Sequence, residues 1–435
     1  MTIVNNLYGA LREVESKYKS QLKIVHVNAQ SLLCLAHATE FQHLFNNAKV
    51  DIIAVSETFY RDSNDYVSLD GYDLFAANRS TYEGGGVAIY VRRPLICKIL
   101  CQSEPPLHRV SKPDYLIVEV CSHNFKALFA CVYRPPKAGH FQDFEENLSN
   151  LVPDYNYSII AGDVNGHFGS SNPHDVADSR QITRMLDVCG LDLIPYGSTF
   201  HLDNDYNSWL DMIASNCDDE CIHYDKFAIR GLSARDLLLA VFNFKVPASQ
   251  PEWKQRRDLK NLDLSKLQDD ALSAPWEDIL GLNDIDSKVK RFNQILLELY
   301  NKHAPLKKYK QTVTPKPWIT DDILMLIELR DMAYSKYCSN KCEQLSLAFK
   351  KLRNQVKQEC RNAKLRYAHS LFEGNRSSRQ VWQSIKSLDV GKKNVICNNG
   401  LSSDELNSHY TNVQEGDPDL IKSNIVLRCS SMARP

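Results

Sequence analysis

The sequence lacks the patterns that place a protein in a membrane or outside the cell. No uninterrupted apolar run approaches the roughly 18 residues of a membrane-spanning helix. The stretch from Met1 to Lys23 does not show the basic-then-apolar pattern of a secretory signal. The 13 cysteines are odd in number and scattered, which indicates reduced thiols rather than a disulfide framework. We therefore expect a nuclear or cytoplasmic protein that is neither secreted nor embedded in a membrane.

The net charge of the chain is close to zero, at −1, but the charges are unevenly distributed. From Lys302 to Lys393 there are 20 lysines and arginines against 8 acidic residues, whereas the rest of the chain has 32 against 45. A basic segment on an acidic body suggests a polyanionic partner. A solvated helical face would have the same composition, so charge alone leaves both interpretations open.

Two other chemistries lack a complete motif. Cys217, Cys221 and His223 supply three candidate zinc ligands, but a structural zinc site usually has four. Cys338 and Cys342 are likewise interpreted as scattered thiols. The acidic pairs at 218–219 and 269–270 do not follow the apolar strand that a polymerase site requires. Neither a zinc site nor polymerase activity is predicted.

The first part of the chain alternates predicted strands with shorter helices. Strands are expected at 22–28, 50–57, 86–92, 115–121, 127–133, 157–163, 209–213 and 237–244. Helical periods lie between them at 36–46, 141–151 and 181–188. Nearly continuous apolar runs such as VDIIAVSE are typical of strands that are buried on both faces. This pattern favours an α/β fold with a sandwich core.

After Pro251 we expect the strands to vanish and long helical periods to replace them. Helices are predicted at 289–300 and 321–337, and a third carries an apolar stripe from Phe349 to Leu371. The opposite face of this third helix is basic. Four parts follow from these changes: an N-terminal extension (1–21), an α/β domain (22–248), an all-α basic segment (249–393) and a poorly ordered tail (394–435).

Polar side chains end several of the predicted strands. They are Asn28, Glu57, Tyr133 with Arg134, Asp163 with Asn165, and Asp211. Carboxylate and amide oxygens are hard ligands that suit Mg²⁺ or Mn²⁺. Such an ion neutralises phosphate charge and stabilises a leaving oxygen. Each residue alone is more often a strand cap or a turn residue, but the set is far more specific and indicates a site for phosphate esters.

The motifs VNAQS, SETF, RSTYEGGGVAIYV, VYRPP, GDVN and SWLDMI occur in this order. With them the chain resembles the endonuclease/exonuclease/phosphatase family from Leu22 to Phe244. More narrowly, it resembles the apurinic-type endonuclease domain of non-LTR (LINE) retrotransposons of the jockey-like or I-like kind. The helical part from Trp253 to Leu388 resembles the segment that joins endonuclease to reverse transcriptase in such elements. We expect the chain to stop before a reverse transcriptase would begin.

The resemblance implies a two-sheet, DNase I-like α/β sandwich with a divalent metal, Mg²⁺ or Mn²⁺, at one edge, and DNA as substrate. It implies that Glu57 is the principal metal ligand, and that Asn28 and Asp163 help to hold the metal and water. Asp163 and Asn165 would orient the attacking water and bind the phosphate, which the hydroxyl of Tyr133 would also contact.

Two further family positions carry over by resemblance. Asp211 corresponds to the acid that supports a catalytic histidine. Arg79 and the glycines at 84–86 match a stretch whose role we interpret as structural.

The last family motif departs from its usual Ser-Asp-His. The matching residues are Ser233, Ala234 and Arg235, followed by Asp236, which we expect to be a family position of its own. Arginine stays protonated at neutral pH and cannot act as a general base, a role worth roughly 10²–10⁴ in rate. Arg235 could still bind phosphate as a bidentate donor. We therefore predict a recognisable site with much reduced or absent cleavage.

Three functional hypotheses remain open. The first is a metal-dependent endonuclease acting on DNA and derived from a retrotransposon. The second is a non-catalytic nucleic-acid-binding protein on the same scaffold, which would use its basic helices to bind DNA and possibly RNA. The third is a phosphatase of small phosphoesters, against which the helical extension argues. The sequence indicates neither the oligomeric state nor the target site.

Overall fold

The computed structural model describes residues 7–388 in segments. The ranges outside the description are 80–83, 105–111, 137–140, 171, 202–206, 248–252, 260, 311–316, 374–379, 382–383 and 386–387. The tail predicted to be poorly ordered, 394–435, also lies outside the described residues.

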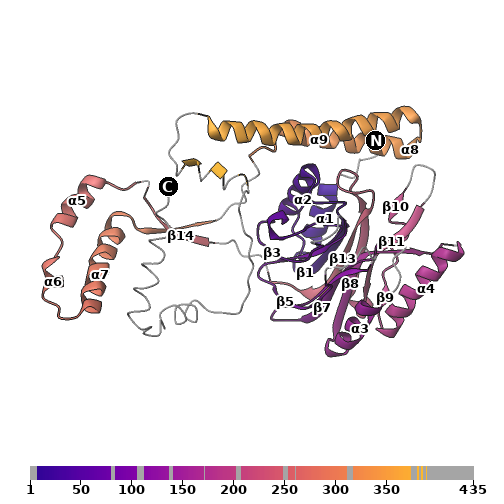
Figure 1. Ribbon diagram of the computed structural model, residues 1–435, viewed down its shortest axis with the longest axis horizontal. Helices are drawn as coiled ribbons and strands as arrows, with labels where there is room; N and C mark the ends of the chain where they lie inside the picture. Colours follow the sequence, from indigo (N-terminus) through magenta and orange to yellow (C-terminus); the bar gives the residue numbers. More distant parts are fainter. Residues whose placement is uncertain are drawn as a thin grey trace, which may run out of the picture. The chain divides into compact units, whose positions relative to one another are not determined.

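Two β-sheets face each other and share one hydrophobic core (Figure 1). The first sheet has the strand order β12-β13-β1-β2-β4-β3, and the second has β10-β11-β8-β7-β6-β5, with β9 paired to β11. In the first sheet the strands are β1 (Gln21–Asn28), β2 (Ile52–Ser56), β3 (Tyr72–Ala77), β4 (Val87–Arg92), β12 (Cys221–Ala228) and β13 (Asp236–Lys245). In the second they are β5 (Ile96–Gln102), β6 (Asp114–Cys121), β7 (Lys126–Tyr133), β8 (Tyr157–Phe168), β9 (Asp192–Leu193), β10 (Phe200–His201) and β11 (Asn207–Ser215).

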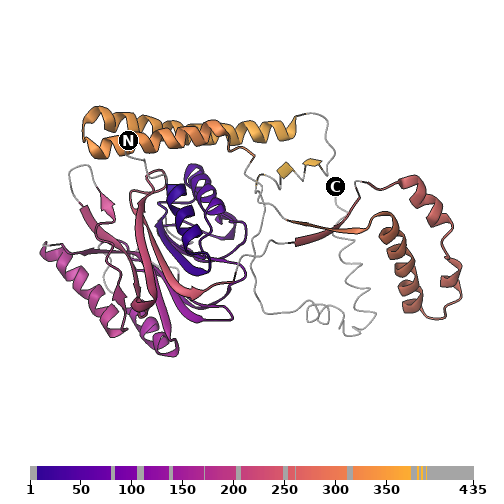
Figure 2. The same ribbon diagram turned by 180° about the vertical axis from the view of Figure 1, so that it is seen from behind.

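Helices cover the outer face of each sheet, so the central strands are buried on both sides (Figure 2). Helices α1 (Leu7–Lys17) and α2 (Leu35–Asn47) pack against the first sheet. Helices α3 (Gln142–Leu151) and α4 (Pro173–Val188) pack against the second. Burial on both faces explains the nearly continuous apolar run of β2. The predicted two-sheet α/β sandwich is confirmed, and α1 is an additional helix that the sequence pattern did not predict.

The segment after the sandwich is mainly helical, as predicted. Its helices are α5 (Leu264–Leu272), α6 (Glu277–Leu280), α7 (Ile285–His303), α8 (Asp321–Ser339) and α9 (Glu343–Phe372). The expectation that strands vanish after Pro251 is wrong in one place. Strand β14 (Trp253–Arg257) pairs antiparallel with β15 (Leu306–Lys310), from Trp253↔Lys310 to Arg257↔Leu306. Both strands are five residues long and rich in basic side chains, so neither shows an apolar alternation that identifies a strand.

Helices α8 and α9 form an antiparallel pair that packs on α2. Val356, Cys360 and Ala363 of the predicted α9 stripe are buried with Ile323 and Ile327 of α8, in a cluster that includes Ala36 and Trp318. Thr320 occupies the N-cap position of α8, although its side chain makes no capping hydrogen bond. None of the helices in the described ranges combines the length and apolarity that a bilayer crossing requires.

Candidate functional site

Strand pairing brings the polar strand ends together at one edge of the sandwich. In the first sheet, Asn28 at the end of β1 is paired with Ser56, the residue before Glu57. In the second sheet, Asp163 of β8 is paired with both Tyr133 of β7 and Asp211 of β11. Residues that are up to 183 positions apart in the chain, from Asn28 to Asp211, therefore belong to one edge.

Two residues of this edge have a backbone conformation that side chains disfavour. The φ angle is 53° at Glu57 and 45° at Asn165, both in the left-handed region. A non-glycine residue in that region is uncommon and tends to persist where the surrounding structure imposes it, often at functional sites. Gln30, Ser31, Phe59 and His167 share this conformation, so the unusual backbone extends over the segments that contain the motifs SETF and GDVN.

Asn28 links the carboxylates of the two sheets. Its Nδ2 donates to Oε1 of Glu57 at 2.8 Å and to Oδ2 of Asp163 at 2.7 Å. Its Oδ1 accepts from the backbone N–H of Gln30 at 3.1 Å, and the residue is fully buried. The amide is thus held by local bonds, and it draws Glu57 and Asp163 toward a common point.

The environment makes the ionised form of Glu57 costly in the absence of a cation. Burial, followed by the nearby charge of Asp163, raises the pKa of Glu57, and this is opposed by Asn28, Arg235 and the Tyr133 hydroxyl. Burial, Glu57 and Asp163 together raise the pKa of Tyr133, so the phenol stays protonated at neutral pH. The Tyr133 hydroxyl can therefore donate a hydrogen bond to an anion at this edge.

Arg235 occupies the centre of the carboxylate cluster. Its Nη2 donates to Oδ2 of Asp163 at 3.1 Å and to Oδ1 of Asn165 at 3.0 Å, and its Nε lies 4.0 Å from Oδ2 of Asp211. The guanidinium also lies over the ring of Phe200, with Cζ 4.7 Å from the centroid. Burial disfavours the charged guanidinium, but Asp163, Asp211 and Glu57 outweigh it and raise the pKa of Arg235.

Asp211 lies deep beside Arg235. The hydroxyl of Thr199 donates to Oδ2 of Asp211 at 2.6 Å, and Nδ1 of the buried His26 lies 3.9 Å from Oδ1. Burial and then Asp163 raise the pKa of Asp211 well above its usual range. Burial, reinforced by Arg235, lowers the pKa of His26 to about 3, so that His26 is neutral at ordinary pH. The acid expected to support a histidine in the last motif faces an arginine instead.

Asn165 is held in place from two sides. Its Nδ2 donates to the backbone carbonyl of Arg134 at 2.7 Å, and its N–H donates to Oδ1 of Asp163 at 3.1 Å. These bonds turn Oδ1 of Asn165 toward Arg235. Local hydrogen bonds therefore fix the side chain of Asn165 relative to Asp163 and Arg235.

The stretch interpreted as structural makes a buried ion pair near the same edge. Nε of Arg79 donates to Oδ1 of Asp114 at 2.8 Å, and the N–H of Gly86 donates to Oδ2 of Asp114 at 2.8 Å. Gly85 has a φ of 74°, and a Cβ there would lie 2.5 Å from Oδ2 of Asp114. The glycines therefore allow a close approach of backbone to carboxylate.

Residues outside the recognised sequence motifs hold the Arg235 segment. Asp236 accepts from Nη2 of Arg230 at 2.7 Å and is bonded to Nε2 of His201 at 2.9 Å, and this second contact raises the pKa of His201. Asp236 had been assigned only as a separate family position. Arg230 and His201 belong to no recognised motif, so only their spatial contacts identify them.

The family model for the Endonuclease/Exonuclease/phosphatase family matches residues 6–238, just over half of the 435 residues. The chain therefore belongs to this family. None of the curated proteins compared with the chain matches it significantly in sequence.

Three solved structures illustrate the likeness. The endonuclease domain of TRAS1, a telomere-specific non-LTR retrotransposon, is 17% identical, with 52% of this chain and all of that domain covered and a TM-score of 0.39. The AP endonuclease LMAP from Leishmania major is 11% identical, with 54% and 91% covered and a TM-score of 0.43. The 3′ phosphatase NExo from Neisseria, bound to product DNA hairpin, is 15% identical, with 51% and 99% covered and a TM-score of 0.39.

The donor set at this edge fits a divalent cation held mainly by one carboxylate. Among the described residues, no three His, Cys, Asp or Glu side chains gather in a cluster that could hold a metal ion. Asp163 already accepts from Asn28 and Arg235 at Oδ2 and from Asn165 at Oδ1, whereas Glu57 is half-buried. Mg²⁺ commonly binds through one or two carboxylates and keeps its remaining positions for water and phosphate.

Proposed function

We propose that this chain is a divalent-metal-dependent phosphodiesterase of retrotransposon origin that acts on DNA and whose cleavage is strongly reduced by Arg235. The observation that carries the proposal is the double hydrogen bond from Nη2 of Arg235 to Asp163 and Asn165. The acidic and amide groups of a phosphodiesterase edge are thus gathered around a side chain that cannot accept a proton at neutral pH.

In this proposal Glu57 holds the metal ion, with Asn28 and Asp163 beside it. When bound, Mg²⁺ or Mn²⁺ would neutralise phosphate charge and stabilise the leaving oxygen. The Tyr133 hydroxyl would donate to a phosphate oxygen, and Asn165 would orient the phosphate or the attacking water. Each role is supported by the position of the residue at the shared edge.

Arg235 acts against cleavage in two ways. It cannot take the proton of the attacking water, since the carboxylates around it stabilise its charged form further. Its positive charge beside Asp163 also repels a divalent cation. It would still attract phosphate, so binding of DNA is reduced less than its cleavage.

A second candidate function, non-catalytic nucleic-acid binding, is favoured by basic surfaces after the sandwich. The exposed basic residues of α9 include Lys350, Lys351, Lys357 and Arg361. In the β14–β15 ladder Arg256 is directly opposite Lys307. Either DNA or RNA could bind this basic surface. We also propose a nuclear or cytoplasmic location for the protein.

A plasmid-nicking assay with Mg²⁺ tests the two functions. The natural chain is compared with Arg235→His and with the double variant Ala234→Asp/Arg235→His, each with and without Glu57→Ala. We expect the double variant to nick supercoiled DNA about 100-fold faster than the natural chain, and Glu57→Ala to remove this gain. Equal nicking by the natural chain and the double variant, abolished in both by Glu57→Ala, would contradict the inhibitory role of Arg235. DNA binding without nicking in every variant would support the second candidate.

A further inference from the structure

The loop between β12 and β13, residues 229–235, lies between the candidate site and helix α8. Its end carries Arg235, whose guanidinium is buried among Asp163, Asn165 and Asp211. Its beginning contacts α8, which follows the sandwich by more than 70 residues in the chain. The loop therefore contacts the helical segment near its beginning and the candidate site at its end.

Arg230 binds the residues on both sides of Arg235. Its Nη1 donates to the carbonyl of Ala234, the residue before Arg235, and its Nη2 donates at 2.7 Å to Oδ1 of Asp236, the residue after it. The side chain of Arg230 is 8% exposed. A rigid fork that bonds to both neighbours restricts the direction in which Arg235 leaves the backbone.

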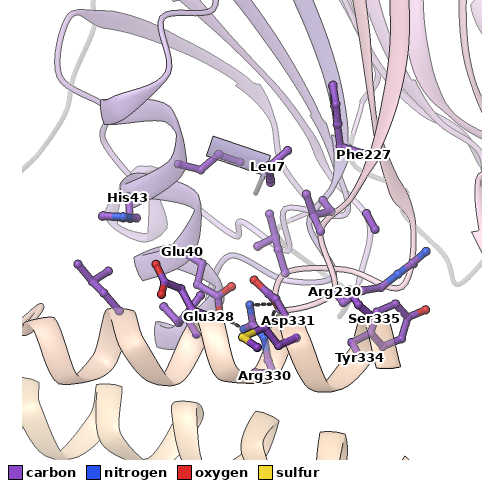
Figure 3. A pocket seen from close by; sticks show the side chains of 18 of the residues that line it. Leu7, Glu40, His43, Phe227, Arg230, Glu328, Arg330, Asp331, Tyr334 and Ser335 are labelled. Atoms are coloured by element: carbon purple, nitrogen blue, oxygen red, sulfur yellow. Dashed lines mark hydrogen bonds and ion pairs between the residues drawn. The ribbon is translucent and has the colours of Figure 1, made fainter. Parts of the chain in front are cut away.

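Helix α8 covers Arg230 from the outside. The ring of Tyr334 lies 5.1 Å from Cζ of Arg230, within range of a cation–π contact. Figure 3 shows the two side chains next to each other, with Tyr334 coming from the helix and Arg230 from the loop. The helix thus shields the charged fork from water and holds it in one orientation.

One turn earlier in α8, Arg330 contacts the same loop. Its Nη1 donates to Oε1 of Glu40 in α2 at 2.6 Å, and its side chain is only 3% exposed (Figure 3). Gly231 lies directly against this ion pair, because a Cβ at that position would be 1.9 Å from Nη1 of Arg330 and 2.1 Å from Oε2 of Glu40. The backbone beside Arg230 therefore has no room to move toward the helix.

A cavity lies between α8 and the sandwich, so that α8 contacts the 229–235 loop through only a few residues. It has a volume of about 660 Å³ and is lined by α1, α2, the end of β12, the loop and α8, including Leu7, His43, Phe227 and Met332. Across this space α8 is not packed continuously on the sandwich. The contacts at Arg330 and Tyr334 consequently carry much of the connection between α8 and the loop.

We infer that Arg230 is a positioning residue for Arg235, and that helix α8, through Tyr334 and Arg330, holds Arg230 in place. The helical segment after the sandwich is then part of the support of the candidate site, in addition to any role in binding nucleic acid. The positioning of Arg235 by Arg230 and α8 is inferred from contacts alone. The effect of this positioning on cleavage rests on the proposed function.

Hydrogen exchange in the full chain tests the structural part. The amides to follow are those of Arg235, which donates to Oγ of Ser233, and Asp236, which donates to the carbonyl of Thr199. We expect Tyr334→Ala and Arg230→Gln each to speed hydrogen exchange in the peptide that contains these two amides by about tenfold, because the loop opens more often. Tyr334→Phe keeps the ring and Met325→Ala alters an exposed residue of α8, so both should leave exchange unchanged.

Kinetics in the Ala234→Asp/Arg235→His background test the functional part. There Arg230→Gln should lower kcat more than it changes KM, Arg230→Lys should recover part of the loss, and Met325→Ala should have no effect. Unchanged exchange in both Tyr334→Ala and Arg230→Gln, with folding intact by circular dichroism, would overturn the inference. If no protein in this background nicks DNA, the proposed function fails, but the exchange result still decides whether Arg230 positions the segment.

Discussion

Arg235 Nη2 lies 3.1 Å from Oδ2 of Asp163, the same carboxylate oxygen that accepts a hydrogen bond from Asn28. The guanidinium thereby joins the network that links the two sheets at the candidate site. One residue therefore changes both the proton chemistry of the edge and its electrostatic potential. Each effect can be measured separately.

Replacing Arg235 with glutamine should strengthen binding of Mn²⁺. The substitution removes a positive charge next to Asp163 while keeping a hydrogen-bond donor, and we expect the affinity to rise about 10-fold to 100-fold. Isothermal titration calorimetry on the full chain measures this directly. Arg61→Gln alters an exposed arginine paired with Asp65 and serves as the control. An affinity that does not change in Arg235→Gln would show that the guanidinium does not oppose the metal.

The buried pair between Arg330 and Glu40 should be sensitive to the loss of one partner. Arg330→Met leaves the carboxylate of Glu40, whose side chain is 11% exposed, without its main counter-charge, and we expect a loss of about 3–5 kcal/mol. The double variant Arg330→Met/Glu40→Met removes both of these charges and should recover part of that loss, although Asp331, which also accepts from Arg330, then lacks its partner. Urea unfolding followed by circular dichroism provides the comparison. A loss below about 0.5 kcal/mol in Arg330→Met would mean that α8 is not anchored by this pair.

Much of the sandwich was predictable because its strands are buried on both faces. The stretches at 22–28 and 157–163 are buried almost throughout, although β8 continues beyond Asp163 to Phe168. Strand register then explains why Asn28, Glu57 and Asp163 meet, since the ends of neighbouring strands share an edge. Local pattern and long-range pairing agree for these elements.

Other features depend on contacts that leave no local pattern. Strands β14 and β15 pair across about 50 residues with hardly any apolar alternation, so the sequence predicts neither. The Arg230 fork is visible only when the loop and α8 are placed together. Ala234 and Arg235 were predicted as a departure from the last motif, but the bonds from Arg235 to Asp163 and Asn165 required the structure.

Binding of DNA by the basic face of α9 should depend on salt in a way that its lysines control. Lys350 and Lys357 are exposed and two helical turns apart, so they lie on the same side of α9. Each phosphate contact adds about 0.9 to the slope of log K against log salt, so Lys350→Gln/Lys357→Gln should lower the slope by about one to two. Fluorescence anisotropy with a short duplex at several salt concentrations measures it. The matched control is Lys98→Gln/Lys245→Gln, which alters exposed strand positions of the sandwich. If both double variants change the salt slope equally, α9 is not the binding surface.

The last prediction concerns His26, which is fully buried between Ser56 and Asp211. Burial lowers the pKa of His26 to about 3 in the folded chain, whereas the unfolded chain has the ordinary value of 6.5. Between these values the unfolded state binds a proton that the folded state does not, so the free energy of unfolding falls as the pH falls. The slope from this residue is at most about 1.4 kcal/mol per pH unit.

Urea unfolding in EDTA from pH 7 to pH 4.5 checks this, since the chelator removes any contribution from metal binding. His26→Gln keeps a donor for Ser56 and cannot become charged, so its stability should change less with pH than that of the natural chain. His37→Gln is a useful comparison, because burial lowers the pKa of His37 too, but that residue is less enclosed. Parallel pH curves for the natural chain and His26→Gln would show that His26 takes up a proton in the folded state and that the buried edge admits water.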